Sequence, residues 1–348
     1  MANYTVAPED DEYDVFIQDD AGSGDEEQRH PHEAELLTAH QLLPLCSALF
    51  TVGCLDNVLV LFILIKYKGL KAAGNIHFLN LTISHLCFLL PLPFWAQAAA
   101  HGGHPGKPVC KVLLGLQSTS LQGGALFIIF LVMEACQGCF HTNRWSSALR
   151  TVPGGIITSI LAWTVAILVT LPEFVFYELP MDWQKYKCAF SKPSFLPGEE
   201  PFWKHFLTLK MNVLVLLFPL SIFIFCSVQA RKTQSFRERH YDLCKLVSVI
   251  MGVFLLMWAP YNAALFLYAF QEHLFLQDQS SYSLDTSVQV TKIIASTHCC
   301  VNPLLYLLLD KDSRKYLCGL SSLCKDIPFQ PSVHSDVPRE GHDQSTQL

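Results

Sequence analysis

The hydrophobic residues of this chain gather into long apolar blocks that short polar stretches separate. Seven such blocks lie at approximately 42–66, 76–100, 109–140, 154–178, 206–230, 244–270 and 288–309. About 20 apolar residues are needed to cross the hydrocarbon of a bilayer, and about 10–14 are too few. Every block passes this test. The pattern therefore predicts an all-α membrane protein, a bundle of seven transmembrane helices.

The third block is the one that the other helices are expected to surround. Its stretch Val109–Met133 holds no residue charged at neutral pH except Lys111, near its start. Polar and small residues such as Gln117, Gln122 and Gly123 interrupt it. These residues suit contact with neighbouring helices better than contact with lipid.

The charged residues between the blocks give the direction of insertion. The gaps after the first, third, fifth and seventh blocks are basic, with Lys66, Lys68, Lys71, Arg144, Arg150, Arg231, Lys232, Arg237, Arg239, Lys245, Lys311, Arg314 and Lys315. The alternate gaps are mixed or acidic. Since Lys and Arg collect on the cytoplasmic side, the N-terminus is expected outside the cell and the C-terminus in the cytoplasm. This orientation suits a multi-pass protein of the plasma membrane.

Residues 1–41 precede the first block and are strongly acidic. Twelve Asp and Glu residues and one Arg lie between Glu9 and Glu35. So polar a segment is expected to be disordered on its own, and no cleavable signal peptide is expected before it. Two interpretations stay open: a solvated tail, or an electrostatic lure for a basic protein. The lure would use acidic residues and tyrosines suited to sulfation, beside a glycosylation sequon at Asn3; these residues are Tyr4, Asp11, Glu12, Tyr13 and Asp14.

A short amphipathic helix is expected after the last block. Tyr316–Cys318 and Leu320–Leu323 combine apolar and polar positions there, which suits the inner leaflet of the membrane. Cys318 and Cys324 are either palmitoylated or plain reduced thiols. Residues 319–348 form the predicted cytoplasmic tail, after a bundle that occupies residues 42–318.

The chain shows no sign of catalytic or cofactor chemistry. It has no Gly-rich phosphate loop, nucleophile elbow or paired catalytic carboxylates, so we expect no enzyme, no cofactor and no nucleic-acid partner. Most of its 13 cysteines lie in apolar blocks, where thiols act as small hydrophobes. His101 and His104 are too few ligands for a metal. Consecutive residues of a helix point about 100° apart, so His298-Cys299-Cys300 is interpreted as helix packing, and no metal site is predicted.

The sequence also disfavours a transport function. The ionisable residues that a proton or ion path would need inside the blocks reduce to His85 and Glu134. Glu134 lies near the inner interface, and no internal repeat is visible.

Several motifs stand in order on the expected helices. They are Asn57-Val-Leu-Val60, Pro91-Leu-Pro-Phe-Trp95, Trp258-Ala-Pro-Tyr-Asn262 and His298-Cys-Cys-Val-Asn-Pro-Leu-Leu-Tyr306. Residues 42–318 thereby resemble the rhodopsin-like G-protein-coupled receptors, in particular an atypical member of the chemokine-receptor branch. The resemblance implies a disulfide between Cys110 and Cys188 and a ligand site at the outer mouth that includes Trp95 and Tyr261. It also implies retained switch motifs at Asn57, Trp258, Pro260, Asn302, Pro303 and Tyr306.

Three switch positions depart from the family pattern. Signalling members carry Asp/Glu-Arg-Tyr at the inner end of the third helix, where this chain has Glu134-Ala135-Cys136. His85 stands where the family has an aspartate that binds sodium, and Ser227 stands where it has a tyrosine. Ala135 has neither a charge nor a hydrogen-bond donor in its side chain, so it cannot form the ion pair or the G-protein contact that the family's arginine makes.

A fourth departure concerns the ligand. Lys292 corresponds to a glutamate of the seventh helix that commonly meets ligand amines in the family. A lysine there would favour a ligand that ends in a carboxylate, unless its side chain snorkels outward. The resemblance implies chemerin, a secreted protein with a functional C-terminal peptide, as the ligand, with chemokines as a second class.

These residues together predict a non-signalling receptor that captures a secreted protein. The bound ligand would be concentrated or presented to a signalling chemokine receptor, also as a heteromer with that receptor, or it would be internalised. The alternative is a G-protein-coupled chemokine receptor with an unusual inner face.

Overall fold

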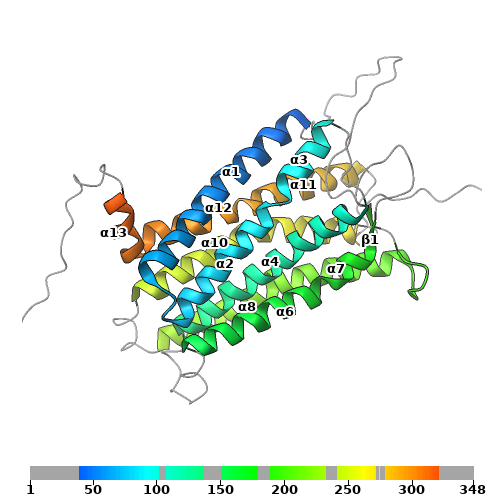
Figure 1. Cartoon of the computed structure of the whole chain (residues 1–348). Coiled ribbons are helices and arrows are strands. Elements are labelled where there is room, and N and C mark those ends of the chain that lie inside the picture. The colour runs from blue at the N-terminus through cyan, green and yellow to red at the C-terminus, as the bar shows by residue number, and fades with distance from the viewer. Residues whose placement is uncertain are drawn as a thin grey trace, which may run out of the picture.

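The predicted bundle is present in the structure of the protein, a computed structural model. It describes residues 39–101, 107–136, 150–178, 189–190, 192–232, 241–271, 274 and 279–320. Within these residues, seven helical spans are long and apolar enough to cross a membrane, and they correspond one to one to the seven predicted blocks. Figure 1 shows them side by side along one common direction. The predicted all-α fold is confirmed.

The first four spans are formed by helices α1 to α6. These are α1 (Ala39–Ile63) with the π-helical turn η1 (Leu64–Lys68), α2 (Ala73–Leu89) with α3 (Leu92–His101), α4 (Lys107–Cys136) and α6 (Val152–Phe176). A two-stranded antiparallel hairpin follows, in which Tyr177 of β1 (Tyr177–Glu178) pairs with Phe190 of β2 (Ala189–Phe190).

The fifth and seventh of the last three spans each consist of more than one helical segment. The fifth consists of α7 (Glu200–Met211), the π-helical segment η3 (Asn212–Leu217) and α8 (Phe218–Lys232). The sixth is α10 (Tyr241–Ala269), and the seventh is α11 (Gln279–Ser296) followed by α12 (His298–Leu309). The expected short helix after the last span is present as α13 (Lys311–Leu320). We call the end of the bundle near α13 the inner end and the opposite end the outer end, after the predicted orientation.

Prolines mark two junctions between helical segments, one in the second span and one in the fifth. Pro91 lies between α2 and α3, and Pro219 is the second residue of α8, directly after η3. Proline lacks the amide N–H and its ring clashes with the carbonyl of the preceding turn. A wider π-helical turn before Pro219 makes room for that ring, so the span continues without a break.

The fifth span begins earlier than the hydrophobic pattern predicts, at Glu200 instead of residue 206. Its additional residues, Glu-Pro-Phe-Trp-Lys-His, combine two adjacent aromatic residues with charged and polar ones. Pro201 occupies the first turn, where a missing N–H has no cost. The ring of Trp203 lies 5.0 Å from that of Phe176, so packing against α6 holds this outer turn in place.

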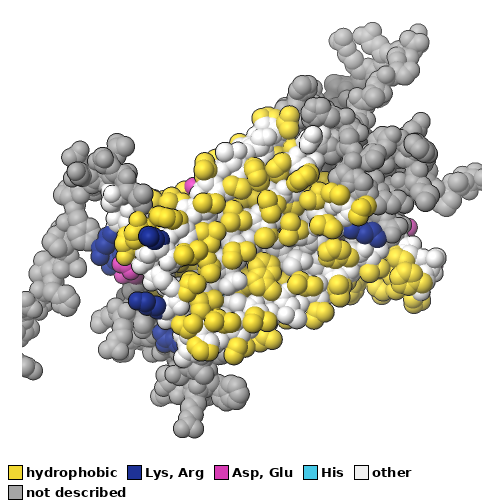
Figure 2. All heavy atoms as spheres, in the orientation of Figure 1, with side chains coloured by type: hydrophobic (Ala, Val, Ile, Leu, Met, Phe, Trp, Pro, Cys, Tyr) yellow, Lys and Arg dark blue, Asp and Glu magenta, His cyan; other side chains and the backbone are white. Residues whose placement is uncertain are grey.

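Burial separates the central helix from the helices that face lipid. In the most apolar window of the span Pro108–Cys136, 72% of residues are buried, against 17% in the span Glu200–Gln229. The third span is thus the centre of the bundle, as predicted. Figure 2 shows hydrophobic side chains over the middle of the visible face and most charged ones towards its two ends. This distribution suits a protein surrounded by lipid.

Candidate functional site

A cavity opens inside the outer half of the bundle. It measures about 110 Å³ and draws its lining from α2, α4, α6, α7, α10 and α11. The aromatic rings of Phe88 and Trp258 lie edge to face at 6.2 Å, and Tyr261 packs on Trp258 at 5.6 Å. All three line the cavity. A ligand segment entering from the outer end would meet this aromatic floor.

The cavity also carries charged groups of both signs. Glu173, Lys204 and Lys292 belong to its lining. Glu173 of α6 forms an ion pair with Lys210 of α7, and both side chains are about nine-tenths buried. Lys204 lies 3.1 Å from Glu200, one turn earlier on the same helix. Since Lys292 of α11 belongs to this lining, its side chain reaches the cavity.

The Glu173–Lys210 pair corrects the expectation that His85 and Glu134 are the main ionisable residues inside the spans. An intramembrane Glu in the run Leu171-Pro-Glu-Phe-Val175 is itself a signal of function or pairing. Its partner could not be identified from the sequence, because the two residues lie 37 positions apart. The α6–α7 contact brings them together.

Below the aromatic floor, three helices meet around His85. Asn57 of α1 donates hydrogen bonds to the carbonyl oxygens of Gly53 at 2.7 Å and Cys299 at 2.8 Å. Its Oδ1 lies 3.2 Å from Nδ1 of His85, and the ring of His298 lies edge to face with His85 at 5.4 Å. His85 and His298 are 2% and 3% exposed. The departure at the helix-two position thus creates a pair of buried imidazoles.

The structure contradicts part of the geometric argument against a shared site in His298-Cys299-Cys300. His298 and Cys299 each place one ligand atom, together with His85, in a cluster whose atoms lie within 4.8 Å of one another. The imidazole bends back towards the preceding turn, with Nδ1 at 2.8 Å from the carbonyl oxygen of Ala295, so Nε2 comes within 3.5 Å of Cys299 Sγ. Cys300 points elsewhere, to the carbonyl of Leu49 at 3.5 Å, as the helical spacing predicts.

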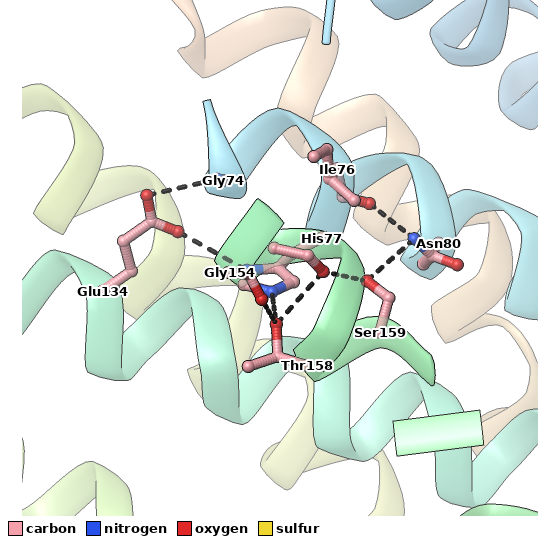
Figure 3. Close-up of polar contacts among 9 residues, drawn as sticks. Gly74, Ile76, His77, Asn80, Glu134, Gly154, Thr158 and Ser159 are labelled. Atoms are coloured by element: carbon pink, nitrogen blue, oxygen red, sulfur yellow. Dashed lines mark hydrogen bonds and ion pairs between the residues drawn. The ribbon is translucent and has the colours of Figure 1, made fainter. Parts of the chain in front are cut away.

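At the inner end of α4, Glu134 turns towards α2 and α6, as Figure 3 shows. One carboxylate oxygen accepts a hydrogen bond from the Gly74 N–H at 3.1 Å, and the other lies 3.5 Å from Nδ1 of His77. Nε2 of His77 lies 2.8 Å from the hydroxyl of Thr158. Glu134 is therefore held by two partners on α2. His77 is a partner that sequence reasoning missed.

Close helix packing makes this arrangement possible. A Cβ on Gly155 of α6 would stand 2.8 Å from the Cα of Ala73, so only glycine lets α6 approach α2 this closely. Asn80 continues the contact with a hydrogen bond to Ser159 at 3.2 Å and accepts one from Trp163 at 3.0 Å. His77 and Asn80 are three residues apart and so share one face of α2.

Ala135 and Cys136 face the inner core. Ala135 is 6% exposed, and its carbonyl oxygen accepts a contact of 3.4 Å from Cys244 Sγ. Cys136 Sγ makes a similar contact, at 3.4 Å, with the carbonyl oxygen of Cys226. A cavity of about 50 Å³ lies beside them and also touches Ser227. Among the residues that the structure describes there, every one that lines this cavity is uncharged: Val132, Ala135, Cys136, Phe223, Cys226, Ser227, Cys244, Val247 and Ser248.

The retained motif of the last helix is buried. Asn302 and Tyr306 are each 2% exposed, and Tyr306 packs on Phe78 with ring centres 4.7 Å apart. The ammonium of Lys68 lies 5.3 Å from the Tyr306 ring and forms an ion pair of 2.7 Å with Asp310. Burial disfavours the charged Asp310 carboxylate, but its hydrogen bonds to Lys68 and Ser313 outweigh burial and lower its pKa.

The remaining predicted residues divide into two groups. Trp95 and Cys110 pack together with Leu113 and Leu114 in a small buried cluster, and Trp95 does not belong to the cavity lining. Pro260 and Pro303 lie inside α10 and α12, and Cys318 is half-buried on α13. The other predicted residues lie outside the described part of the chain, so their roles and the Cys110–Cys188 disulfide stay predictions: Asn3, Tyr4, Asp11, Glu12, Tyr13, Asp14, Cys188 and Cys324.

Comparisons with known proteins agree with this geometry. Residues 56–306 match the family described as 7 transmembrane receptor (rhodopsin family). The chain is 57% identical to the mouse protein named C-C chemokine receptor-like 2, over 100% of this chain and 97% of that protein. It is 54% identical to the human protein of the same name, over 100% of both. With the C-C chemokine receptor type 3 of Macaca mulatta it shares 39% identity over 85% of each.

Proposed function

Because this chain belongs to the rhodopsin family of seven-transmembrane receptors and is of the chemokine-receptor type, we propose that it captures a secreted protein without activating a G protein. The supporting observation is the inner end of α4. A buried Ala135 methyl stands where signalling members carry an arginine, and the adjoining cavity has an uncharged lining among the described residues. Glu134 is held instead by Gly74 and His77.

The missing guanidinium matters for both states of such a switch. In the family, the arginine first pairs with its neighbouring acid and is then released to contact the G protein. In this chain, Glu134 has its partners on α2. No ion pair between Glu134 and the next residue would therefore hold the inactive state, and none would be released on activation. The thiol contacts of Cys136 and Cys244 with backbone carbonyls are weak interactions that leave no charged group for a partner.

For the ligand, we propose chemerin, with chemokines as the second class. The acidic residues 9–35, outside the cell in the proposed orientation, would attract a basic ligand at long range. Lys204 and Lys292 on the cavity wall would attract a carboxylate at the end of a ligand segment. The aromatic floor of Phe88, Trp258 and Tyr261 would pack on the apolar side chains of such a segment. The protein would then present the ligand to a signalling chemokine receptor, on the same or a neighbouring cell, or internalise it.

One observation favours a second candidate, a signalling chemokine receptor with an unusual inner face. Trp258 and the Asn302-Pro303-Tyr306 motif, which signalling members use, are retained and buried. This candidate predicts ligand-dependent nucleotide exchange, which the first one excludes.

The binding experiment uses labelled chemerin and a panel of labelled chemokines on cells that express the full chain. We expect saturable chemerin binding that an unlabelled C-terminal chemerin peptide displaces. Saturable binding of chemokines alone would overturn the choice of chemerin. Absence of binding by every one of these proteins would overturn the proposed capture.

A further inference from the structure

The cluster of His85, His298 and Cys299 lies inside the bundle, below the outer cavity, and has a composition that receptor switching does not explain. Each residue offers one metal-ligating atom, and the three atoms lie within 4.8 Å of one another. All three side chains are buried, with Cys299 at 0% exposure. Imidazole and thiolate are the side chains that soft transition-metal ions prefer.

The hydrogen bonds around both imidazoles leave one nitrogen of each available. Nδ1 of His298 lies 2.8 Å from the carbonyl oxygen of Ala295, which can only accept, so Nδ1 carries the proton and Nε2 has the lone pair. The amide of Asn57 donates to two backbone carbonyls, so its Oδ1 faces Nδ1 of His85 as an acceptor. Nε2 of His85 is therefore also unprotonated, and it has no hydrogen-bond partner among the described residues.

This pattern is the one that metal-binding histidines show in proteins. Such a histidine usually donates its second N–H to a carbonyl or carboxylate, which fixes the tautomer and the ring orientation. Asn57 adds a direct link, since it holds His85 and the backbone of Cys299 at the same time.

The distances fit a metal with a small adjustment. Metal–nitrogen and metal–sulfur bonds of about 2.0 and 2.3 Å separate two ligand atoms by roughly 3.6 Å. Nε2 of His298 and Sγ of Cys299 already lie 3.5 Å apart. The limit of 4.8 Å for the whole cluster leaves a movement of roughly 1 Å for the third ligand, which a side-chain rotation can supply.

The surroundings decide which soft ion suits the cluster. The rings of Phe88, Phe254 and Trp258 contact His298 at 5.4, 5.6 and 5.4 Å. In so apolar a place an uncompensated charge is costly. Two neutral imidazoles and one thiolate carry one negative charge, which Cu(I) neutralises, whereas Zn²⁺ would leave one positive charge. Zn²⁺ would also need a fourth ligand for its usual tetrahedral site.

We propose that His85, His298 and Cys299 form a three-coordinate Cu(I) site directly below the floor of the outer cavity. On binding, the Cys299 thiol loses its proton to solvent and the thiolate sulfur bonds to the metal. No electron is transferred, because the ion arrives as Cu(I). Since Phe88 and Trp258 contact His298 and also line the cavity, the bound metal would fix the floor on which a ligand rests.

The test uses the full chain, purified in lipid nanodiscs without oxygen and without thiol reductants. Cu(I) is delivered as its acetonitrile complex and partitioned against a chromophoric Cu(I) chelator. We expect Cys299→Ser to lose one tight equivalent, with an affinity at least about 100-fold weaker at that site. Cys300→Ser is the matched control, since its thiol faces Leu49, and it should keep the wild-type stoichiometry and affinity.

A second measurement does not depend on any variant folding. X-ray absorption of the native chain loaded with one equivalent of Cu(I) should show two nitrogen ligands and one sulfur ligand. Coordination by sulfur alone would mean that other thiols of the chain hold the ion, and it would overturn the proposal. So would equal binding by the native chain and Cys299→Ser, an equal loss in Cys300→Ser, or tight binding of Zn²⁺ without Cu(I).

Discussion

The outer and the inner cavity of the bundle differ in the charge of the residues that line them. The outer cavity includes Glu173, Lys204 and Lys292 in its lining, with aromatic rings between them. The inner cavity, as far as it is described, is lined by methyl, thiol, hydroxyl and phenyl groups around Ala135 and Cys136. The outer cavity therefore offers charged groups to a ligand, whereas the described lining of the inner cavity offers none. This difference is what the proposed function, capture of a ligand without activation of a G protein, requires.

The largest effect is expected from breaking the charge pair beside the outer cavity. Glu173→Leu would leave the ammonium of Lys210 buried without its partner, which typically costs about 3–5 kcal/mol. Thermal unfolding in nanodiscs should show this loss, and Glu173→Leu with Lys210→Met should recover most of it. Glu200→Gln is the matched control, because Glu200 is exposed and a helical pair of this spacing, here with Lys204, contributes only about 0.3–0.5 kcal/mol. Equal losses in Glu173→Leu and Glu200→Gln would show that the buried pair contributes nothing special.

The second-largest effect is expected from Lys292, which lines the outer cavity. Lys292→Gln should weaken the binding of chemerin at least about 10-fold, which corresponds to about 1.4 kcal/mol, while Lys292→Arg should retain most of it. Equilibrium binding to whole cells measures the change. Lys66→Gln, an exposed lysine at the inner end, should bind as the native chain does. Unchanged affinity in Lys292→Gln would remove this lysine from the ligand site.

The acidic tail should affect the rate of association more than the final affinity. Replacement of the Asp and Glu residues between Glu9 and Glu35 by Asn and Gln should slow association roughly 10-fold at low salt. The difference should disappear at high salt, because screening removes long-range attraction. Surface plasmon resonance on captured nanodiscs separates the two rates. If the native and the neutralised chains associated with the ligand equally fast at every salt concentration, the tail would be no more than a solvated segment.

The smallest expected effect concerns the ion pair of Lys68 and Asp310, at the inner end. The pKa of Asp310 is lowered in the folded protein, so the unfolded state binds the proton more readily and stability rises with pH through this window. The stabilisation, about 1 kcal/mol, is complete above the unfolded pKa of about 4 and is lost as the pH falls through the folded value. Melting curves of Asp310→Asn should therefore lie below those of the native chain at pH 6 and approach them in strong acid. A constant difference at all pH values would contradict this assignment.

The fold could be predicted from the sequence because a bilayer imposes a simple rule. Inside the hydrocarbon, the backbone N–H and C=O groups of a long apolar block such as Pro108–Cys136 find their partners within a spanning helix. Pro91 correctly predicted the junction between α2 and α3. The earlier start of the fifth span at Glu200 was missed, since Trp203 and its neighbours form a helix through contact with Phe176 and not through a continuous apolar run.

The site could be predicted only where one residue carried the information. Ala135, His85 and Lys292 were identified as departures from the motifs of the family that the sequence resembles, each by its residue type at one position. The partnership of His77 with Glu134 and that of Glu173 with Lys210 join residues 57 and 37 positions apart, and no local pattern indicates which helices touch. The cluster of His85, His298 and Cys299 depended on the direction in which the His298 ring bends, which spacing along a helix does not reveal.

The contrast between the two cavities is tested most directly by nucleotide exchange on a panel of G proteins. The membranes contain the native chain and no other receptor for the ligand, and bound ligand is measured in the same sample. With the native chain, we expect full occupancy by the ligand and nucleotide exchange at the ligand-free rate. Ligand-dependent exchange is expected only in the double variant Ala135→Arg with His85→Asp, where these two positions alone limit coupling. A robust ligand-dependent rise in exchange with the native chain would contradict the account.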